Sequence, residues 1–270
     1  QAKAMVNKTL SHLNREHSGN WRNIVMVLGD DGDRNEHMDN ANDVARVIEL
    51  YNPEIEVRKV MWDAYNRVSE ARNNTYPEVY QLLTAQMNNG AMVFNYTGHA
   101  NPMSLSHEYV LNLKDFKQTT KPHYPLWVTA ACDVMPFDGV SENIGETAVL
   151  NANGGALAFY GTTRTVYANQ NLIMNRYFTK HLFACDAQGQ RNRLGDAIRM
   201  AKGDIVGGNM DLAYLENKLH YALLGDPALV IGAPLNHVVL DSINGKAASL
   251  YAPADIKAGS HIRLTGHIET

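Results

Sequence analysis

The chain has 270 residues, of which 45% are hydrophobic and 19% are charged, with a formal net charge of −4. That length is enough for one substantial hydrophobic core and a small second module. There is no long block of Lys or Arg, so the sequence lacks the basic surface needed to bind nucleic acid or an anionic membrane. No apolar run approaches the roughly 18 residues of a membrane-spanning helix.

Two cysteines occur, in different surroundings. Cys132 ends an apolar run, whereas Cys185 lies where a helical pattern gives way to a polar loop. Two cysteines exclude a disulfide-dense secreted scaffold and a cysteine-based zinc cluster. The sequence leaves open whether the two form one disulfide.

Short apolar runs alternate with helical patterns along residues 21–233. Near-continuous apolar runs separated by helices are typical of a parallel sheet buried on both faces. We therefore predict a doubly wound, mostly parallel α/β sheet flanked by helices. The predicted strands are 24–31, 56–62, 91–99, 125–133 and 155–163, and the predicted helices are 38–51, 79–89, 142–152, 169–184, 193–206 and 211–224.

The pattern changes near residue 234. The segments HVVLDSI, SLYAP and SHIRLTGHIE read as short antiparallel strands, with turn signals at Asn244-Gly245 and Lys257-Ala258-Gly259. Too few residues remain for a sandwich of about seven strands. We expect residues 1–20 to end a preceding segment, residues 21–233 to form the α/β domain, and residues 234–270 to begin a truncated β-sandwich module.

Open parallel sheets bind ligands beyond the carboxyl ends of their strands. The third predicted strand ends in Gly98-His99 and the fourth ends in Cys132-Asp133, 33 residues after the histidine. That separation suits one crossover, so neighbouring strands would bring His99 and Cys132 together.

A cysteine attacks as its thiolate, which a neighbouring imidazole favours, and a histidine can protonate a leaving amine near neutral pH. Gly98 lacks a β-carbon, so its N–H can approach a substrate carbonyl and join the N–H of Cys132 as an oxyanion hole. A lone histidine or cysteine at a strand end is more often structural. The two together favour catalysis, and His107 in the following loop is a weaker candidate.

Residues 29–33, GDDGD, have three interpretations. The acids form a solvated loop with an Asp at a helix N-cap, or they hold a calcium ion although the EF-hand spacing is missing. In the third, Asp31 orients His99 as the last member of a triad. The sequence leaves these alternatives open.

The segments NYTGHA (95–100), WVTAACD (127–133) and LLGDPAL (223–229) resemble those of the gingipain-type cysteine peptidases, which have a caspase-like fold. The resemblance spans roughly 20–233. Within the family, GDDGDRNEHMDNA (29–41) is most similar to the C-terminal signal peptidases, or sortases, of the type IX secretion system.

The resemblance implies roles for individual residues. The family's catalytic histidine and cysteine match His99 and Cys132, and its oxyanion donors match the N–H groups of Gly98 and Cys132. Its acidic member is a Glu before a Gly, where this chain has the shorter Asp31 before Gly32.

The loop after the fifth strand lines the family's primary specificity pocket. A cation in that loop disfavours basic substrate side chains. The resemblance therefore implies substrate contacts for Thr162, Thr163, Arg164 and Tyr167, of which Arg164 carries the cation.

The resemblance also implies a function. It predicts a cysteine endopeptidase that removes C-terminal sorting domains from secreted cargo and transfers the acyl group to an amine of anionic lipopolysaccharide. The expected place is the extracellular face of a bacterial outer membrane, beside a secretion partner such as PorV, with the signal peptide outside this chain and an immunoglobulin-like module after the catalytic domain. No cofactor is required, a structural calcium ion is compatible with it, and nucleic acid is not a partner.

Two alternatives stay open. One is a broad gingipain-like extracellular protease, and the other is a non-catalytic scaffold of a secretion complex. The intact Gly-His and Cys pair favours catalysis over the scaffold.

Overall fold

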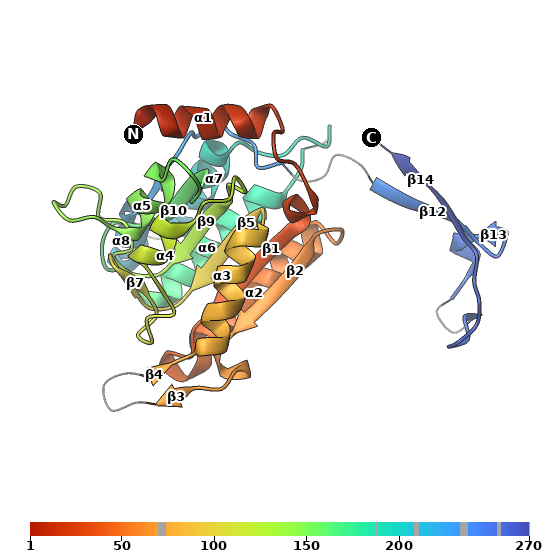
Figure 1. Cartoon of the computed structure of the whole chain (residues 1–270), viewed down its shortest axis with the longest axis horizontal. Coiled ribbons are helices and arrows are strands. Elements are labelled where there is room, and N and C mark those ends of the chain that lie inside the picture. Colours follow the sequence, from red (N-terminus) through yellow and green to blue (C-terminus); the bar gives the residue numbers. More distant parts are fainter. Residues whose placement is uncertain (70–73, 187, 208–210, 233–236, 253–254, 270) are drawn as a thin grey trace. The chain divides into compact units, whose positions relative to one another are not determined.

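The computed structural model describes the chain except for residues 70–73, 187, 208–210, 233–236, 253–254 and 270 (Figure 1). The described residues form two compact units, Gln1–Ile231 and Gly232–Thr270, each considered by itself below. The sequence pattern separates residues 1–20 from residues 21–233, whereas the structure includes residues 1–20 in the first unit.

A six-stranded sheet forms the centre of the first unit, in the order β11-β10-β9-β5-β1-β2. All neighbouring strands are parallel except β11, which runs antiparallel to β10 at one edge. The predicted doubly wound, mostly parallel sheet is confirmed. The strands are β1 (Ile24–Gly29), β2 (Glu56–Met61), β5 (Val93–Thr97), β9 (Leu126–Ala130), β10 (Ala158–Thr162) and β11 (Tyr221–Leu224).

Strand β11 departs from the sequence prediction. A single helix was expected over 211–224, but α8 (Leu212–His220) ends at His220 and β11 follows it. The strand supplies hydrogen-bond partners to β10, which would otherwise be an unpaired edge. The Tyr221 side chain is buried, and its hydroxyl donates to Asn171 at 2.5 Å. Edge pairing and this burial outweigh the helical pattern.

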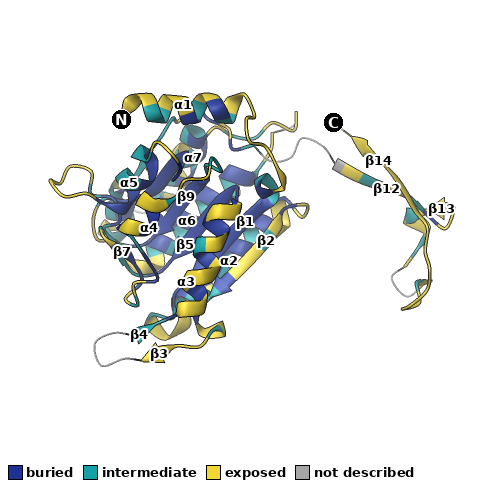
Figure 2. Cartoon of the chain, viewed as in Figure 1, coloured by how far each residue is buried: buried dark blue, intermediate teal, exposed yellow. Residues whose placement is uncertain are grey.

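Helices cover both faces of the sheet, and the central strands are buried along their length (Figure 2). Side chains of α3, α4 and α5 share one core cluster with Phe94 and Trp127. Helices α2 and α6 contact each other, and α6 contacts α7 and α8. Among the described helices, none is long and apolar enough to cross a membrane. The helices are α2 (Glu36–Tyr51), α3 (Pro77–Asn89), α4 (Leu113–Gln118), α5 (Ile144–Leu150), α6 (Ala168–Phe183) and α7 (Leu194–Val206).

The two faces of β5 are built differently. On one face Phe94 stacks on Trp127 of β9 with ring centroids 4.6 Å apart, and Trp127 stacks in turn on Phe159 of β10. Successive strand residues point to opposite faces, so Asn95 points the other way. There its side-chain amide exchanges two hydrogen bonds of 2.8 Å with Asn175 of α6.

Helix α1 (Ala2–Leu13) is anchored to the rest of the first unit by a buried lysine. The Lys8 ammonium donates to the carbonyl oxygens of Ala148 (3.3 Å), Val149 (2.9 Å) and Ala156 (3.1 Å). Two of these carbonyls lie in the last turn of α5, where helical carbonyls lack partners within the helix. Burial lowers the pKa of Lys8 to about 8.

Lys8→Met is expected to lower the free energy of unfolding by about 2–4 kcal/mol, because it removes a charged donor from buried carbonyl groups. Urea denaturation measures the change. Lys3→Met on the exposed side of the same helix is the control and is expected to change it by less than about 0.5 kcal/mol. Equal losses in the two variants would show that Lys8 does not anchor the helix.

Shorter elements surround the carboxyl edge of the sheet. The chain after His99 forms a small antiparallel sheet in the order β6-β7-β8 before α4 begins. A second pair, β3 and β4, lies between β2 and α3. Their bounds are β3 (Val68–Ser69), β4 (Asn74–Thr75), β6 (Ala100–Asn101), β7 (Ser104–Leu105) and β8 (Leu111–Asn112).

The second unit contains an antiparallel sheet in the order β13-β12-β14. The predicted turn at Asn244-Gly245 is confirmed, with φ of 52° and 80°. The segment SLYAP (249–253), predicted as a strand, instead contains the end of a 3₁₀ helix (Ala248–Leu250). Its last residue, Pro253, lies outside the described residues. The strands are β12 (His237–Ile243), β13 (Lys246–Ala247) and β14 (Leu264–Glu269).

Candidate active site

His99 and Cys132 occupy equivalent positions just beyond the ends of neighbouring strands. Strands β5 and β9 are parallel, and Thr97 is the register partner of Ala130. His99 and Cys132 each follow two residues later, and neighbouring strands lie about 4.8 Å apart. The expectation that these two strands are neighbours is confirmed.

The sulfur of Cys132 is bonded elsewhere in this structure. Its thiol donates to the carbonyl oxygen of Val166 at 3.6 Å, and no hydrogen bond joins it to His99 among the described residues. Cys132 is half-buried, and neither it nor Cys185 forms a disulfide. Catalytic hydrogen bonds often tighten only when substrate binds, so this geometry is compatible with a Cys-His dyad.

Both groups are held in their neutral forms. Burial raises the pKa of the Cys132 thiol above its ordinary value, and the Asp133 charge adds to this against the opposing contact with Val166. Burial lowers the pKa of His99, and the nearby His107 and His37 lower it further against the charges of Asp30 and Asp33. At neutral pH the free site therefore holds Cys132 as a thiol and His99 as a neutral imidazole, and His99 has to accept the thiol proton for attack.

Alkylation of Cys132 by iodoacetamide is expected to accelerate steadily with pH up to and beyond pH 9. Its rate follows the thiolate fraction, which rises about tenfold per pH unit below the thiol pKa. A Cys185→Ala background confines the reaction to Cys132, and mass spectrometry follows it. A rate that stays constant from pH 6 to 9 would instead mean a preformed thiolate-imidazolium pair.

Asp30, the first residue after β1, organises the chain around His99. Its buried carboxylate accepts hydrogen bonds from the His99 backbone N–H (2.7 Å), the Tyr96 hydroxyl (3.1 Å) and the Gly32 N–H (3.2 Å). It also makes a short contact with Nδ1 of His37. Burial alone would raise the pKa of Asp30, but the His37 contact and the His99 N–H outweigh burial and lower the pKa.

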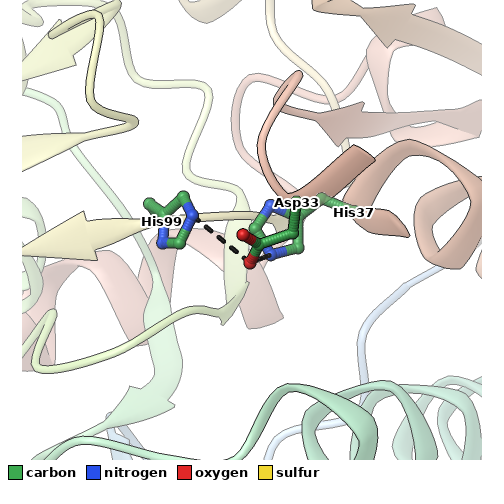
Figure 3. A group of neighbouring side chains, drawn as sticks. All are labelled: Asp33, His37 and His99. Atoms are coloured by element: carbon green, nitrogen blue, oxygen red, sulfur yellow. Dashed lines mark ion pairs between the residues drawn. The ribbon is translucent and has the colours of Figure 1, made fainter. Parts of the chain in front are cut away.

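Asp31 has other partners. Its carboxylate accepts from the Tyr76 hydroxyl at 2.6 Å and from Arg67 at 3.4 Å. The carboxylate that approaches the His99 imidazole is that of Asp33, 3.5 Å from Nε2 (Figure 3). Consecutive residues leaving a strand point to opposite sides, which separates Asp30 from Asp31. The structure thus brings Asp30 and Asp33 to His99, and among the described contacts it does not bring Asp31 there.

The segment after Gly32 has an unusual backbone. Asp33, Arg34 and Asn35 all have left-handed φ, of 52°, 60° and 70°. Such residues cost roughly 1–2 kcal/mol each. Asn35 is the N-cap residue of α2 and makes no side-chain capping bond, so the interpretation of an Asp as N-cap is wrong. The strained turn instead places the Asp33 carboxylate against His99.

Gly98 is required for a reason that the sequence did not reveal. A β-carbon at this position would lie 2.6 Å from Oδ2 of Asp30 and would also clash with the Tyr96 hydroxyl. The Gly98 N–H, predicted as an oxyanion donor, donates to the Ala130 carbonyl at 3.3 Å in this structure. Outside the helices and strands, no described backbone hydrogen bond uses the N–H of Cys132, so that donor is available.

Two further histidines belong to the site. His37 is buried and meets His99 edge to face with ring centroids 4.7 Å apart, and His107 stacks on His99 at 4.1 Å. Burial would lower the pKa of His37, but Asp30, Asp33 and Glu36 outweigh it and raise the pKa. His37 was not among the residues predicted for the site. Its contacts depend on the left-handed turn at residues 33–35, which no sequence pattern indicates.

The loop after β10 lies beside Cys132, because the Cys132 thiol donates to the Val166 carbonyl in that loop. The N–H of Asp133 donates to the Arg164 carbonyl at 3.3 Å. The Arg164 side chain is exposed and pairs with Asp138, with one nitrogen-to-oxygen distance of 3.0 Å, so part of its cationic charge is neutralised.

The other predicted pocket residues have different environments. Thr162 is buried, and its hydroxyl donates to the Ala131 carbonyl, so it supports the chain just before Cys132. Thr163 donates to the His220 carbonyl at 3.1 Å. Tyr167 is 48% exposed at the start of α6. Tyr167 and Arg164 are thus the two of the four with side chains open to solvent.

The fold and the site define an α/β domain that presents a histidine and a cysteine at the ends of neighbouring parallel strands. The family model of peptidase family C25 matches residues 1–232, and the chain belongs to that family. A comparison with curated protein sequences finds no match.

Solved structures show the same fold. The Arg-specific cysteine proteinase gingipain R is 14% identical with a TM-score of 0.68, over 88% of this chain and 55% of that one. The complex of the Porphyromonas gingivalis RgpB pro- and mature domains gives 14% identity and a TM-score of 0.67, over 88% and 56%. A structure described as a protease gives 17% identity and 0.67, over 87% and 55%. This chain therefore spans about half the length of these proteins.

Proposed function

We propose that this chain is the catalytic core of a cysteine endopeptidase that works as a PorU-type C-terminal signal peptidase. Membership of peptidase family C25 supports peptide-bond cleavage through a cysteine. The observation that carries the proposal is the register of β5 and β9, in which Thr97 pairs with Ala130 two residues before His99 and Cys132. The sequence around GDDGD supports the narrower assignment.

The reaction begins with proton transfer from the Cys132 thiol to His99, since both groups start neutral. The sulfur then attacks the scissile carbonyl, and the free N–H of Cys132 stabilises the oxyanion. Gly98 adds a second donor only if its bond to Ala130 opens when substrate binds. His99 next protonates the leaving amine, which leaves a thioester on Cys132.

The thioester is resolved by water or by an amine. Attack by water releases the trimmed cargo, and attack by an amine of anionic lipopolysaccharide attaches the cargo to the lipid. The proposed setting is the extracellular face of the outer membrane, beside a partner such as PorV. No cofactor takes part in these steps.

Asp30 and Asp33 are the acids that support His99 in this proposal. Asp30 fixes the histidine backbone, and Asp33 lies beside the imidazole. Because the Asp33 carboxylate lies 3.5 Å from Nε2 of His99, its negative charge stabilises the imidazolium that forms when His99 accepts the thiol proton.

The test uses two substrates for the same purified protein. One is a secreted cargo protein that carries its C-terminal sorting domain, and the other is a library of unstructured peptides. Cleavage confined to the cargo, at its sorting-domain boundary, supports the proposal. Efficient cleavage of the library indicates a broad protease instead. If the wild-type protein cleaves neither substrate, under conditions where its Cys132 reacts with iodoacetamide, the chain is a scaffold.

A further inference from the structure

Asp33, His37 and His99 bring three metal-ligating groups together. Their ligand atoms lie within 4.8 Å of one another, and no other such group of His, Cys, Asp or Glu occurs among the residues that the structure describes. Oδ2 of Asp33 is 3.5 Å from Nε2 of His37 and 3.5 Å from Nε2 of His99. Figure 3 shows the carboxylate of Asp33 between the two imidazole rings.

The two distances from the Asp33 carboxylate suit a tetrahedral metal. Zinc bonds of about 2.0–2.2 Å place neighbouring tetrahedral ligands roughly 3.3–3.6 Å apart. An octahedral magnesium ion with bonds of about 2.0–2.1 Å needs neighbouring ligands only roughly 2.8–3.0 Å apart. The two distances of 3.5 Å fit the first geometry. Two imidazoles and one carboxylate are also a ligand set that zinc prefers over calcium or magnesium.

Asp30 prepares His37 to act as a ligand. Its carboxylate contacts Nδ1 of His37, which assigns the proton to that nitrogen and leaves the lone pair of Nε2 facing Asp33. A carboxylate behind a ligating histidine is the usual support of zinc-bound imidazoles. The charges of Asp30 and Asp33 together also match the two positive charges of the ion.

The site is open on one side. The His37 side chain is 7% exposed, whereas those of His99 and Asp33 are 31% and 53% exposed. An ion can therefore enter from solvent past Asp33, and three protein ligands leave a fourth position for water.

We propose that Asp33, His37 and His99 bind a zinc ion that reversibly inhibits the peptidase. Zinc on Nε2 of His99 leaves the remaining ring proton on Nδ1, so the imidazole has no free lone pair with which to accept the Cys132 proton. Binding of the ion is independent of the proposed function, whereas the inhibition rests on it.

Binding is tested on the full chain carrying Cys132→Ala and Cys185→Ala, which removes both thiols. Cobalt, titrated as a spectroscopic substitute for zinc, is expected to give one equivalent with the intense visible bands of tetrahedral coordination, and zinc is expected to displace it. Asp33→Asn and His37→Gln are each expected to weaken zinc binding at least tenfold. Asp33 is on the surface, so its variant keeps the test valid if His37→Gln does not fold.

His267→Gln is the matched control, because His267 also lies between two carboxylates but in the second unit. It is expected to leave the affinity of the first site unchanged. Failure of zinc to bind, binding that Asp33→Asn does not weaken, or weak octahedral cobalt bands would each overturn the proposed site.

Inhibition is tested separately with both thiols present. The zinc concentration for half inhibition of cleavage is expected to rise at least tenfold in Asp33→Asn, measured relative to the activity of that variant without metal, and a chelator is expected to restore activity. Equal sensitivity of wild type and variant would overturn the inhibitory role. A chain that cleaves nothing yet binds cobalt as described contradicts the proposed function and leaves the metal site standing.

Discussion

Replacement of Cys132 by Ala is expected to lower kcat/KM for cargo cleavage by about 10³-fold or more. The variant loses the sulfur that forms the thioester, and the remaining donors and binding contacts supply only a small residual rate. Because the Cys132 side chain is half-buried and the substitution is small, the fold is expected to persist. Initial rates and a circular dichroism spectrum of the same sample separate the two effects.

Cys185→Ala provides the control for Cys132→Ala. Cys185 is exposed and unpaired, far along the chain from the loop that carries Cys132. Its replacement is expected to leave kcat/KM within about twofold, as for other surface substitutions. If the two variants process cargo equally well, the nucleophile is a different residue.

Asp30→Asn is expected to reduce both activity and stability, whereas Asp31→Asn is expected mainly to weaken local hydrogen bonds. Removal of one charge from a buried pair costs about 3–5 kcal/mol, because the partner is left without compensation. Loss of the Asp30 charge also weakens the hold on the His99 N–H, so kcat/KM is expected to fall at least tenfold. In Asp31→Asn the hydrogen bonds from Tyr76 and Arg67 lose their charged acceptor, which costs about 1 kcal/mol of stability.

The destabilisation by Asp30→Asn depends on pH in a defined direction. The pKa of Asp30 is lowered from 3.8, so its contribution is present above that value and is lost as pH falls through the lower, folded-state pKa. The pKa of His37 is raised from 6.5, so its contribution is present below that value and is lost as pH rises through the higher, folded-state pKa.

Urea unfolding of wild type and Asp30→Asn at several pH values measures the pH range over which the Asp30–His37 contact contributes to stability. The difference in unfolding free energy is expected to be largest between pH 3.8 and 6.5 and to shrink on both sides. A difference that is independent of pH, or a loss of activity in Asp31→Asn equal to that in Asp30→Asn, would contradict the assignment of roles in this loop.

The sequence alone predicted the sheet and the pair at its edge because both depend on simple patterns. Buried parallel strands require continuous apolar runs, and parallel neighbours bring their carboxyl ends to one edge. His99 and Cys132 end two such runs, and the register of β5 and β9 places them level.

The partners of His99 were harder to predict because they depend on backbone direction over a few residues. Three adjacent acids follow β1, and which of them reaches the imidazole is set by the turn at Asp33 and by the contacts of Asp30. No apolar period or propensity encodes that choice. Strand β11 escaped prediction for a related reason, since its role is to complete an edge that only the folded sheet has.

The reciprocal bonds between Asn95 and Asn175 bear on how the chain selects one pairing of its strands. If β5 slipped by a single residue, Asn95 would take the place of Phe94 on the aromatic face. The side-chain amides of Asn95 and Asn175 would then be buried without hydrogen-bond partners. Such mispaired folds are therefore penalised far from the reactive groups. The Asn95–Asn175 contact, four residues before His99, therefore helps to hold β5 in the register that brings His99 and Cys132 to the same edge of the sheet.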